Sequence, residues 1–393
     1  MKKSLIILGV SQTISSISVT ILIFALMMSS YGNSKSILDL AWVYIATSLP
    51  VFLVAPFCGL LIDKLNKKLN LVIADSICIL SVLFLYFNNY FIFLVVFFVQ
   101  LSISYQGLTN QTLVSLFFNK DKLHMILGWM QFKKALQRLV APALGGYLYN
   151  MLELKYIIAV SIISLIIALI SLIFVNIPSV NIGKLSNSNF INNAGLKYIL
   201  SDKNLFNICI FFIFLNFLSG IYSVVYTPIL LAFSDEQALG YALSIGSLGM
   251  IFASLTSAHI KSLTQKKYQA LLLYVFMNGL SEIFMASYPN FWVYSVGLLF
   301  GCITSSYIAV CNNIIWQSSV PFSIQGATFG ARDFFALGAL PLGMLIGGIF
   351  GDFIKSNYEL SHILILTGIL QLILVAFYSY AWRFEHEGVY SNR

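Results

Sequence analysis

Charge is scarce in this chain of 393 residues: Asp, Glu, Lys and Arg make up 9% of it, whereas hydrophobic residues make up 59%. This balance lies far outside that of soluble domains and excludes a surface that is mainly in contact with water. The apolar residues come in blocks of about 20, enough to cross roughly 30 Å of hydrocarbon as a helix, and lack the roughly 10-residue alternation of a membrane barrel. The sequence therefore predicts an all-α membrane protein.

Clusters of reactive side chains are also lacking. The 5 cysteines lie inside apolar blocks without paired spacing, and the 4 histidines and 14 acidic residues show no spacing typical of a metal site or a catalytic nucleophile. The chain has no Gly-x4-Gly-Lys-Ser/Thr phosphate loop, so we do not expect ATP to drive it directly. The net charge of +8 is spread over short loops, which disfavours nucleic-acid binding. We expect neither an enzyme nor a bound cofactor.

Twelve apolar blocks predict twelve transmembrane helices, near residues 4–28, 40–62, 70–87, 90–116, 125–150, 155–177, 204–231, 237–260, 267–288, 291–316, 327–350 and 360–383. The long polar connection 178–203 separates an N-terminal six-helix bundle, 1–177, from a C-terminal one, 204–393, and contains an amphipathic stretch suited to the membrane surface. A shift of 199 residues lays Lys67 on Lys266, Lys133 on Arg332 and Pro142 on Pro341, which indicates a parallel internal duplication.

Basic residues predict the orientation of these helices. With the N-terminus in the cytoplasm, fifteen of the 22 Lys and Arg fall in cytoplasmic segments and three fall in external loops. The first apolar block is interrupted by Ser and Gln and lacks a small-residue cleavage site, so we interpret it as a retained helix. We expect a multi-pass protein of the cell (inner or plasma) membrane with both termini in the cytoplasm.

The loop after the second predicted helix places an acid, Asp63, at a helix C-terminus, where the helix dipole disfavours it. The loop resembles the Gly-x-x-x-Asp-Arg/Lys-x-Gly-Arg/Lys-Arg/Lys signature of the major facilitator superfamily at Gly59, Asp63, Lys64, Lys67 and Lys68. Asn66 replaces the second glycine, and Asn also tolerates a left-handed conformation. The resemblance implies two pseudo-symmetric six-helix bundles latched by Asp63 against the start of helix eleven near Arg332. The alternative is a plain basic loop.

The predicted fifth helix resembles the antiporter motif of the same superfamily, Gly-x8-Gly-x3-Gly-Pro-x2-Gly-Gly, at Gly128, Pro142, Gly145 and Gly146. Gln137 and Ala141 stand where glycines are usual. Small residues and a proline let a helix bend and pack closely, which limits leakage. The motif implies export rather than uptake. If it is only a generic Gly- and Pro-rich helix, import stays open.

Further segments resemble the macrolide-efflux and enterobactin-exporter branch of the superfamily: Ile73-Ala-Asp75, Gly195-Leu-Lys-Tyr198, Trp316-Gln317-x-x-Val320-Pro321 with Gly326, and Pro341-Leu-Gly343. Many drug–proton antiporters carry an Arg three residues before a Gln-Gly in helix four. Here Ile103 precedes Gln106-Gly107, so a proton relay through that arginine is excluded.

Charged and polar residues inside the apolar blocks are the candidate site residues, because charge in hydrocarbon is costly. We expect Arg138 to face an internal cavity or an acid there, and Asp75 and Glu282 to be the carboxylates that change protonation. The alternative for Asp75 and Arg332 is pairing near the membrane face, and the alternative for Glu282 is an exposed position near the external end of helix nine. Polar stripes at helical spacing predict cavity-lining residues in helices one, four and seven, with helix–helix hydrogen bonding as the alternative: Gln12, Ser15, Gln106, Asn110, Asn216, Tyr222 and Tyr226.

Together these features predict a secondary transporter that exports amphipathic small molecules by alternating access, with the proton as coupling ion. The expected substrates are drug-like, macrolide-like or siderophore-like, and the expected state is a monomer in the lipid bilayer. The alternatives are a non-transporting membrane sensor or assembly protein of the same fold, and an importer.

Overall fold

A computed structural model describes the backbone of residues 2–64, 66–87, 91–117, 120–174, 194–257, 259–260, 266–321, 324–354 and 357–390. It describes the side chains of residues 9–51, 66–87, 91–110, 134–172, 174, 195–257, 259–260, 266–321, 324–325, 328–354 and 360–380. Throughout these ranges the regular structure is helical.

Each of the twelve predicted apolar blocks contains one helix. In chain order these are α1 (Lys2–Ser34), α2 (Ile37–Lys64), α3 (Lys67–Phe87), α4 (Ile92–Phe117), α5 (Lys120–Met151), α6 (Leu154–Ile173), α8 (Lys203–Leu231), α9 (Glu236–Ser257), α11 (Lys267–Ser287), α12 (Phe291–Ser319), α13 (Gln325–Phe353) and α14 (Asn357–Tyr390). Ten helices are long and apolar enough within the described part of the chain to cross a membrane. The chain is therefore a multi-pass membrane protein.

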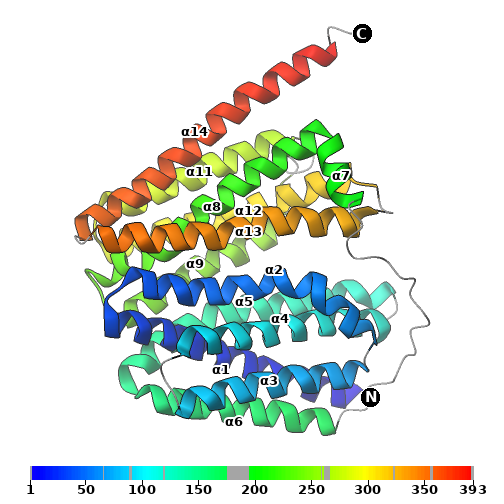
Figure 1. Cartoon of the computed structure of the whole chain (residues 1–393), viewed down its shortest axis with the longest axis vertical. Helices are drawn as coiled ribbons and strands as arrows, with labels where there is room; N and C mark the ends of the chain where they lie inside the picture. The colour runs from blue at the N-terminus through cyan, green and yellow to red at the C-terminus, as the bar shows by residue number, and fades with distance from the viewer. Residues whose placement is uncertain are drawn as a thin grey trace. The chain divides into compact units, whose positions relative to one another are not determined.

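Two compact units share these helices. The first contains Met1–Asn192 together with Glu236–Tyr241, and the second contains Asn193–Asp235 and Ala242–Arg393. In the first unit α1 packs on α5 and α6, and α3 packs on α4 and α6 (Figure 1). In the second unit α8 packs on α13 and α14, and α11 packs on α12 and α14. Several helix pairs of the first unit thus have counterparts in the second, and the internal duplication stays a prediction.

Close helix contacts in the second unit are made at glycines. A side chain at Gly343 or Gly347 of α13 would collide with the backbone of α8 at Phe217 or Ile221. Gly279 of α11 and Gly368 of α14 face each other in the same way, and a Cβ on Gly368 would lie 2.6 Å from the Gly279 carbonyl oxygen. Without a hydrophobic driving force between helices in lipid, such close packing is what holds helix pairs together.

Short polar caps start two of the helices. Asn66 lies directly before α3, where its side-chain oxygen accepts a hydrogen bond from the Lys68 backbone N–H at 3.0 Å. Among the described residues only Lys35 is a non-glycine with positive φ. Asp202 caps α8 by accepting hydrogen bonds from the backbone N–H groups of Asn204 and Leu205.

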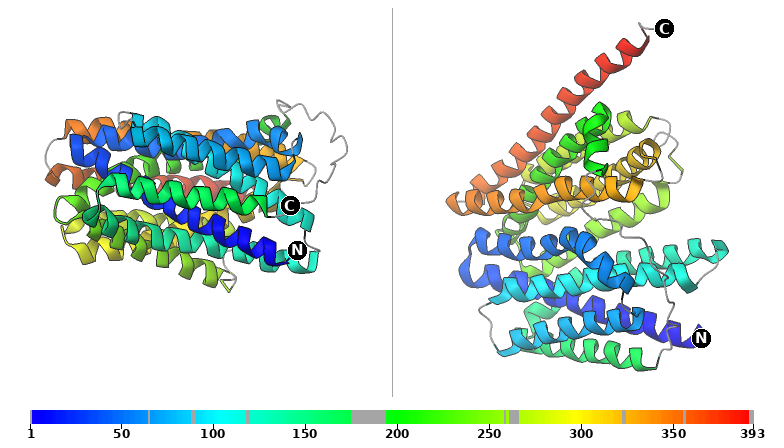
Figure 2. Two further views of the ribbon diagram at one scale, coloured as in Figure 1. Left: turned by 90° about the horizontal axis from the view of Figure 1, so that it is seen from below. Right: turned by 45° about the vertical axis from the view of Figure 1, so that its right-hand side comes forward.

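The predicted amphipathic stretch forms the short helix α7 (Ala194–Ser201), which ends at the Asp202 cap. It packs against α8 and α13 of the second unit. Ile199 is buried in that unit's core, Leu200 is exposed, and the Tyr198 hydroxyl donates to the Ser319 carbonyl oxygen at 3.2 Å. The other end of the second unit's sequence, α14, runs out past its neighbouring helices (Figure 2).

Candidate functional site

Asp75 lies in the third turn of α3, on the face that packs against α4 and α6. Its neighbours on that face, Leu71, Ala74 and Cys78, are buried, and Asp75 itself is only 2% exposed. Residues three and four apart share a helix face, so Asp75 is buried together with these apolar neighbours. An acid in such surroundings is costly and needs a compensating interaction.

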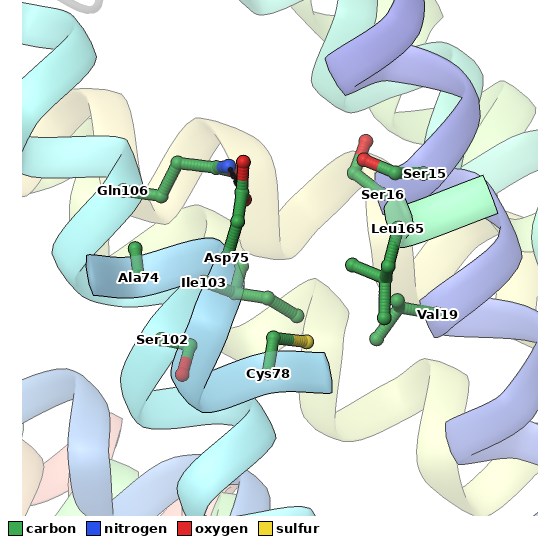
Figure 3. A pocket seen from close by; sticks show the side chains of 10 residues that line it. All are labelled: Ser15, Ser16, Val19, Ala74, Asp75, Cys78, Ser102, Ile103, Gln106 and Leu165. Atoms are coloured by element: carbon green, nitrogen blue, oxygen red, sulfur yellow. Dashed lines mark hydrogen bonds between the residues drawn. The ribbon is translucent and has the colours of Figure 1, made fainter. Parts of the chain in front are cut away.

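Gln106 of α4 supplies that interaction. Its side-chain nitrogen, Nε2, donates a 2.7 Å hydrogen bond to Oδ1 of Asp75. The two side chains point toward each other at the wall of a pocket, with Ser15 and Ser16 of α1 on the opposite wall (Figure 3). The pocket is small and partly open, and its remaining lining is Val19, Ala74, Cys78, Ser102, Ile103 and Leu165.

A second polar contact, one turn further along α4, joins this helix to α1. Asn110 Nδ2 of α4 donates to Gln12 Oε1 of α1 at 3.2 Å. Gln12 is 3% exposed, and its Nε2 has no hydrogen-bond partner among the described residues. The predicted polar stripes of helices one and four therefore meet inside the first unit. A buried amide donor left open in this way is suited to an acceptor group on a ligand.

Supporting contacts surround this site, and the sequence did not point to them. Gln137 of α5 donates from Nε2 to the Ser16 carbonyl oxygen at 3.2 Å and also to the Thr20 hydroxyl. The Tyr105 hydroxyl donates to Asn70 Oδ1 at 2.7 Å, linking α4 to α3. Gln137 stands where the antiporter motif has glycine. This departure was the available sequence indication that the residue makes a side-chain contact.

The pocket combines one carboxylate, amide and hydroxyl groups, and apolar walls. Such a site suits a ligand that is partly apolar and carries a few polar groups. It offers no set of metal ligands: within the described residues, no group of three or more His, Cys, Asp or Glu lies close enough together to hold a metal ion.

The antiporter-motif residues of α5 lie at close contacts within the first unit. Gly145 packs on the Phe24 ring, where a Cβ would come within 2.9 Å. A Cβ on Gly146 would lie 2.5 Å from the Glu236 carbonyl oxygen, and one on Gly240 would meet the Pro142 carbonyl oxygen. Gly128 lies outside the described side chains. The described part of the motif thus permits helix contacts that larger residues would block.

The structure describes the side chains of only some of the predicted latch residues. The side chains of Gly59, Asp63 and Lys64 lie outside the described residues, whereas Lys67 is 6% exposed and Lys68 is half-buried. Arg332 binds its neighbour Asp333 at 2.7 Å and lies over the rings of Trp316 and Phe329. These contacts are all inside the second unit, so the Asp63–Arg332 latch stays a prediction.

The other predicted cavity residues have varied surroundings. Arg138 is exposed on α5, whereas Asn216 of α8 donates back to the Phe212 carbonyl oxygen of its own helix at 2.7 Å. Tyr222 stacks on Tyr226 with ring centroids 5.4 Å apart and donates to the Met285 sulfur at 3.6 Å. Tyr226 is 9% exposed. The two tyrosines pack among α8, α11 and α12, as the helix–helix alternative would have them.

Glu282, the remaining predicted carboxylate, is 3% exposed in α11 and contacts α14. Its partners Thr367, Gln371 and Asn278 were not predicted from the sequence. A recognisable pattern was present, because Asn278 and Glu282, and likewise Thr367 and Gln371, are polar pairs four residues apart in otherwise apolar helices.

The fold and the buried polar sites define a multi-pass helical membrane protein of the transporter class. Residues 5–340 match the family model described as the Major Facilitator Superfamily, and the chain belongs to that superfamily. It is a transporter, not an enzyme.

Curated relatives indicate which branch of the superfamily the chain resembles. The chain is 23% identical over 379 residues to macrolide efflux protein A of Streptococcus pyogenes, covering 91% of each chain. It is 22% identical over 316 residues to macrolide efflux protein A of Enterococcus faecalis, covering 75% of this chain and 96% of the relative. The resemblance to the macrolide-efflux branch is thereby confirmed.

Solved structures share the fold. A bacterial homologue of the iron transporter ferroportin, in an inward-facing state, aligns with a TM-score of 0.71 at 12% identity, covering 96% of this chain and 99% of that one. A mutant of the nucleoside transporter NupG aligns with a TM-score of 0.72 at 16% identity and the same coverage. At these identities the likeness concerns the fold alone.

Proposed function

We propose that this chain is a secondary active exporter of amphipathic small molecules, working by alternating access as a proton antiporter. The observation that carries the proposal is the pocket of the first unit, where a buried carboxylate, the Gln106 amide that binds it and serine hydroxyls meet apolar walls. A membrane protein retains a carboxylate in hydrocarbon at a cost, which favours a functional role for it.

Two further observations support export and the choice of substrate. The relatives named macrolide efflux protein A favour large, partly apolar substrates. The small residues Gly145 and Gly146 lie at close contacts, as an exporter motif in α5 requires. Because the chain has no phosphate loop, an ion gradient is the available energy source, and Asp75 and Glu282 are the carboxylates that exchange protons. Exposed Arg138 is suited to contact an anionic group of the substrate.

The same proposal includes the arrangement in the membrane. Twelve spans form two six-helix bundles, 1–177 and 204–393, joined by the cytoplasmic connection 178–203, and both termini lie in the cytoplasm. The protein acts as a monomer in the cell membrane. The variants Lys35→Cys and Lys184→Cys test this topology by cysteine-accessibility labelling. Residue 35 lies in an expected external loop, and residue 184 lies in the expected cytoplasmic connection. Labelling of both from the same side would contradict this topology.

Accumulation of a panel of macrolides, other hydrophobic antibiotics and siderophores, measured in cells with and without the chain, tests the activity. Ser15→Phe fills the pocket and is expected to restore accumulation to the level of cells without the chain. Ser305→Phe, at an exposed position of α12, is the matched control and is expected to export normally. An unchanged phenotype in Ser15→Phe would favour a sensor or assembly protein.

Flux in inside-out vesicles separates export from import. An exporter accumulates substrate in such vesicles when the lumen is acidified, and collapse of the proton gradient abolishes accumulation. Charge removal by Asp75→Asn and Glu282→Gln together is expected to abolish the coupled flux. Intact coupled flux in the double variant would exclude both carboxylates as proton carriers.

A further inference from the structure

The second unit contains a sealed polar cluster around Glu282, formed where α11, α12 and α14 meet. The backbones of α11 and α14 approach closely at Gly279 and Gly368. Three residues further along each helix, this crossing sets Glu282 of α11 against Gln371 of α14. Glu282 is 3% exposed, and Gln371 is fully buried. The acid is thus held between two helices that cannot separate without losing their closest contact.

Three neutral groups donate hydrogen bonds to the Glu282 carboxylate. Gln371 Nε2 donates to Oε1 at 2.6 Å, and Asn278 Nδ2 donates to the same oxygen at 3.3 Å. The Thr367 hydroxyl donates to the other oxygen, Oε2, at 2.8 Å. Asn278 is itself held by Gln371 Oε1 at 3.1 Å and by the Thr304 hydroxyl of α12 at 2.9 Å. These contacts hold both amides with their nitrogens toward the acid.

The described charges on the surrounding helices do not neutralise this acid. Lys267 is fifteen residues earlier on α11, roughly 22 Å along the helix axis. In α12 the described residues include no Asp, Glu, Lys, Arg or His, and in α14 the described side chains include His362, which is exposed. The titratable groups near Glu282 are Tyr222 of α8 and, around that tyrosine, Tyr226 of α8 and Tyr294 and Cys302 of α12. All four are neutral in their ordinary protonated forms.

Thr367 has one hydroxyl proton and two acceptors within reach. Its oxygen lies 2.8 Å from Glu282 Oε2 and 3.0 Å from the Leu364 carbonyl oxygen of its own helix. When Glu282 is ionised, the hydroxyl donates to Oε2. When a proton binds Oε2, the new O–H donates to the Thr367 oxygen, and the threonine proton turns to Leu364. Proton binding then leaves the hydrogen bonds to Oε1 intact, reverses the direction of the one at Oε2 and directs the threonine proton to Leu364.

We propose that Glu282 and Thr367 form a proton-binding pair, in which the threonine hydroxyl changes from donor to acceptor as Glu282 Oε2 takes up a proton from water. On release, the O–H bond to Oε2 breaks, the proton returns to water, and Thr367 resumes donation. The pair deepens the proposed proton coupling and rests on it for its role in transport. A purely structural cluster would hold the same helices together without exchanging a proton.

Infrared spectroscopy of the purified full chain, titrated with pH in lipid nanodiscs without substrate, tests the pair. We expect a carboxylic C=O band that appears on acidification, is lost in Glu282→Gln and persists in Asp75→Asn. Thr367→Val is expected to shift this band to higher frequency, because the acid O–H loses its acceptor, whereas Thr367→Ser leaves it in place. If Glu282→Gln does not fold, the contrast between the valine and serine variants carries the test.

Three results would overturn the pair: a band that is undiminished in Glu282→Gln, a band that Thr367→Val does not move, or a spectrum that responds to sodium at fixed pH and not to protons. Because the titration needs neither substrate nor gradient, it is independent of the vesicle experiment. Protons bound at Glu282 in a protein that does not export would contradict only the proposed function. Proton-coupled export without titration of Glu282 would contradict only the pair.

Discussion

Asp75 and Glu282 are buried carboxylates on corresponding helices, since α3 and α11 have the same 21-residue length and the same packing partners in their own units. Their surroundings differ. Asp75 receives its hydrogen bond from Gln106 at the wall of a pocket, whereas Glu282 receives three in a glycine-sealed crossing. One acid borders a pocket, and the other is surrounded by the polar side chains of two closely packed helices.

The difference shows that two helices with similar packing partners can hold their acids in different surroundings. Asp75 lies in the third turn of its helix, and Glu282 lies in the fifth turn of the corresponding helix. Polar partners were placed to match each acid, Gln106 on α4 for the first and Thr367 and Gln371 on α14 for the second. The two units thus share a packing scheme but not a site.

The largest effect is expected from a substitution that forces apart α11 and α14 at their glycine contact. Gly368→Leu places side-chain atoms against the Gly279 carbonyl oxygen, and overpacking of this kind costs about 1–3 kcal/mol or more. We expect a loss of folded protein in detergent, measured by thermal melting with fluorescence-detected gel filtration. Gly107→Ala beside the pocket is the control, because its Cβ meets nothing within 4 Å. Equal melting of the two variants would show that the second site is not sealed as described.

The next effect separates the two acids by function. Asp75→Asn removes the carboxylate charge that Gln106 binds but keeps a side chain of nearly the same size. Because the proposed coupling needs a carboxylate that exchanges protons, we expect proton-coupled export in vesicles to fall by more than the melting temperature changes. Cys78→Ser, at the same pocket, leaves the charge in place and is expected to keep most of the activity. A matching loss in both variants would point to packing instead of charge.

A third comparison concerns stability alone. Glu282→Leu leaves the Gln371 amide buried without its acceptor, which costs about 1–3 kcal/mol. Asp75→Leu leaves Gln106 beside a pocket that water can enter, so its cost is expected to be smaller. Melting temperatures of the two leucine variants check this order. A reversed order would mean that the pocket is drier than the crossing.

The smallest effect is expected where the two units are alike. The Tyr105 hydroxyl donates to Asn70 in the first unit, and the Tyr294 hydroxyl donates to the Tyr226 carbonyl oxygen at 2.6 Å in the second. Removing one neutral hydrogen bond by Tyr→Phe costs about 0.5–1.5 kcal/mol in either place. Thermal melting of Tyr105→Phe and Tyr294→Phe should therefore show similar, small decreases. A large decrease in one of them alone would identify a polar network that extends beyond the pair.

Hydrophobic block length was sufficient to predict the helices, because a span in lipid must satisfy its backbone groups within itself and needs about 20 apolar residues. The loop around Asp63 and the glycines near Pro142 likewise carried the family resemblance, which the family model confirms. The acids Asp75 and Glu282 stood out because charge is rare in such blocks. All of these features are local in sequence.

Only the tertiary structure decided which partner each acid has. Gln106 lies 31 residues from Asp75, and Gln371 lies 89 residues from Glu282, so no periodicity within one helix could pair them. The pairing depends on where helices cross. The crossing of α11 and α14 depends on Gly279 and Gly368, and a glycine in the sequence does not indicate which helix it contacts. The sequence by itself predicted a helical transporter with two acids inside apolar blocks, and helix packing buried both, one at the wall of a pocket and the other between two helices.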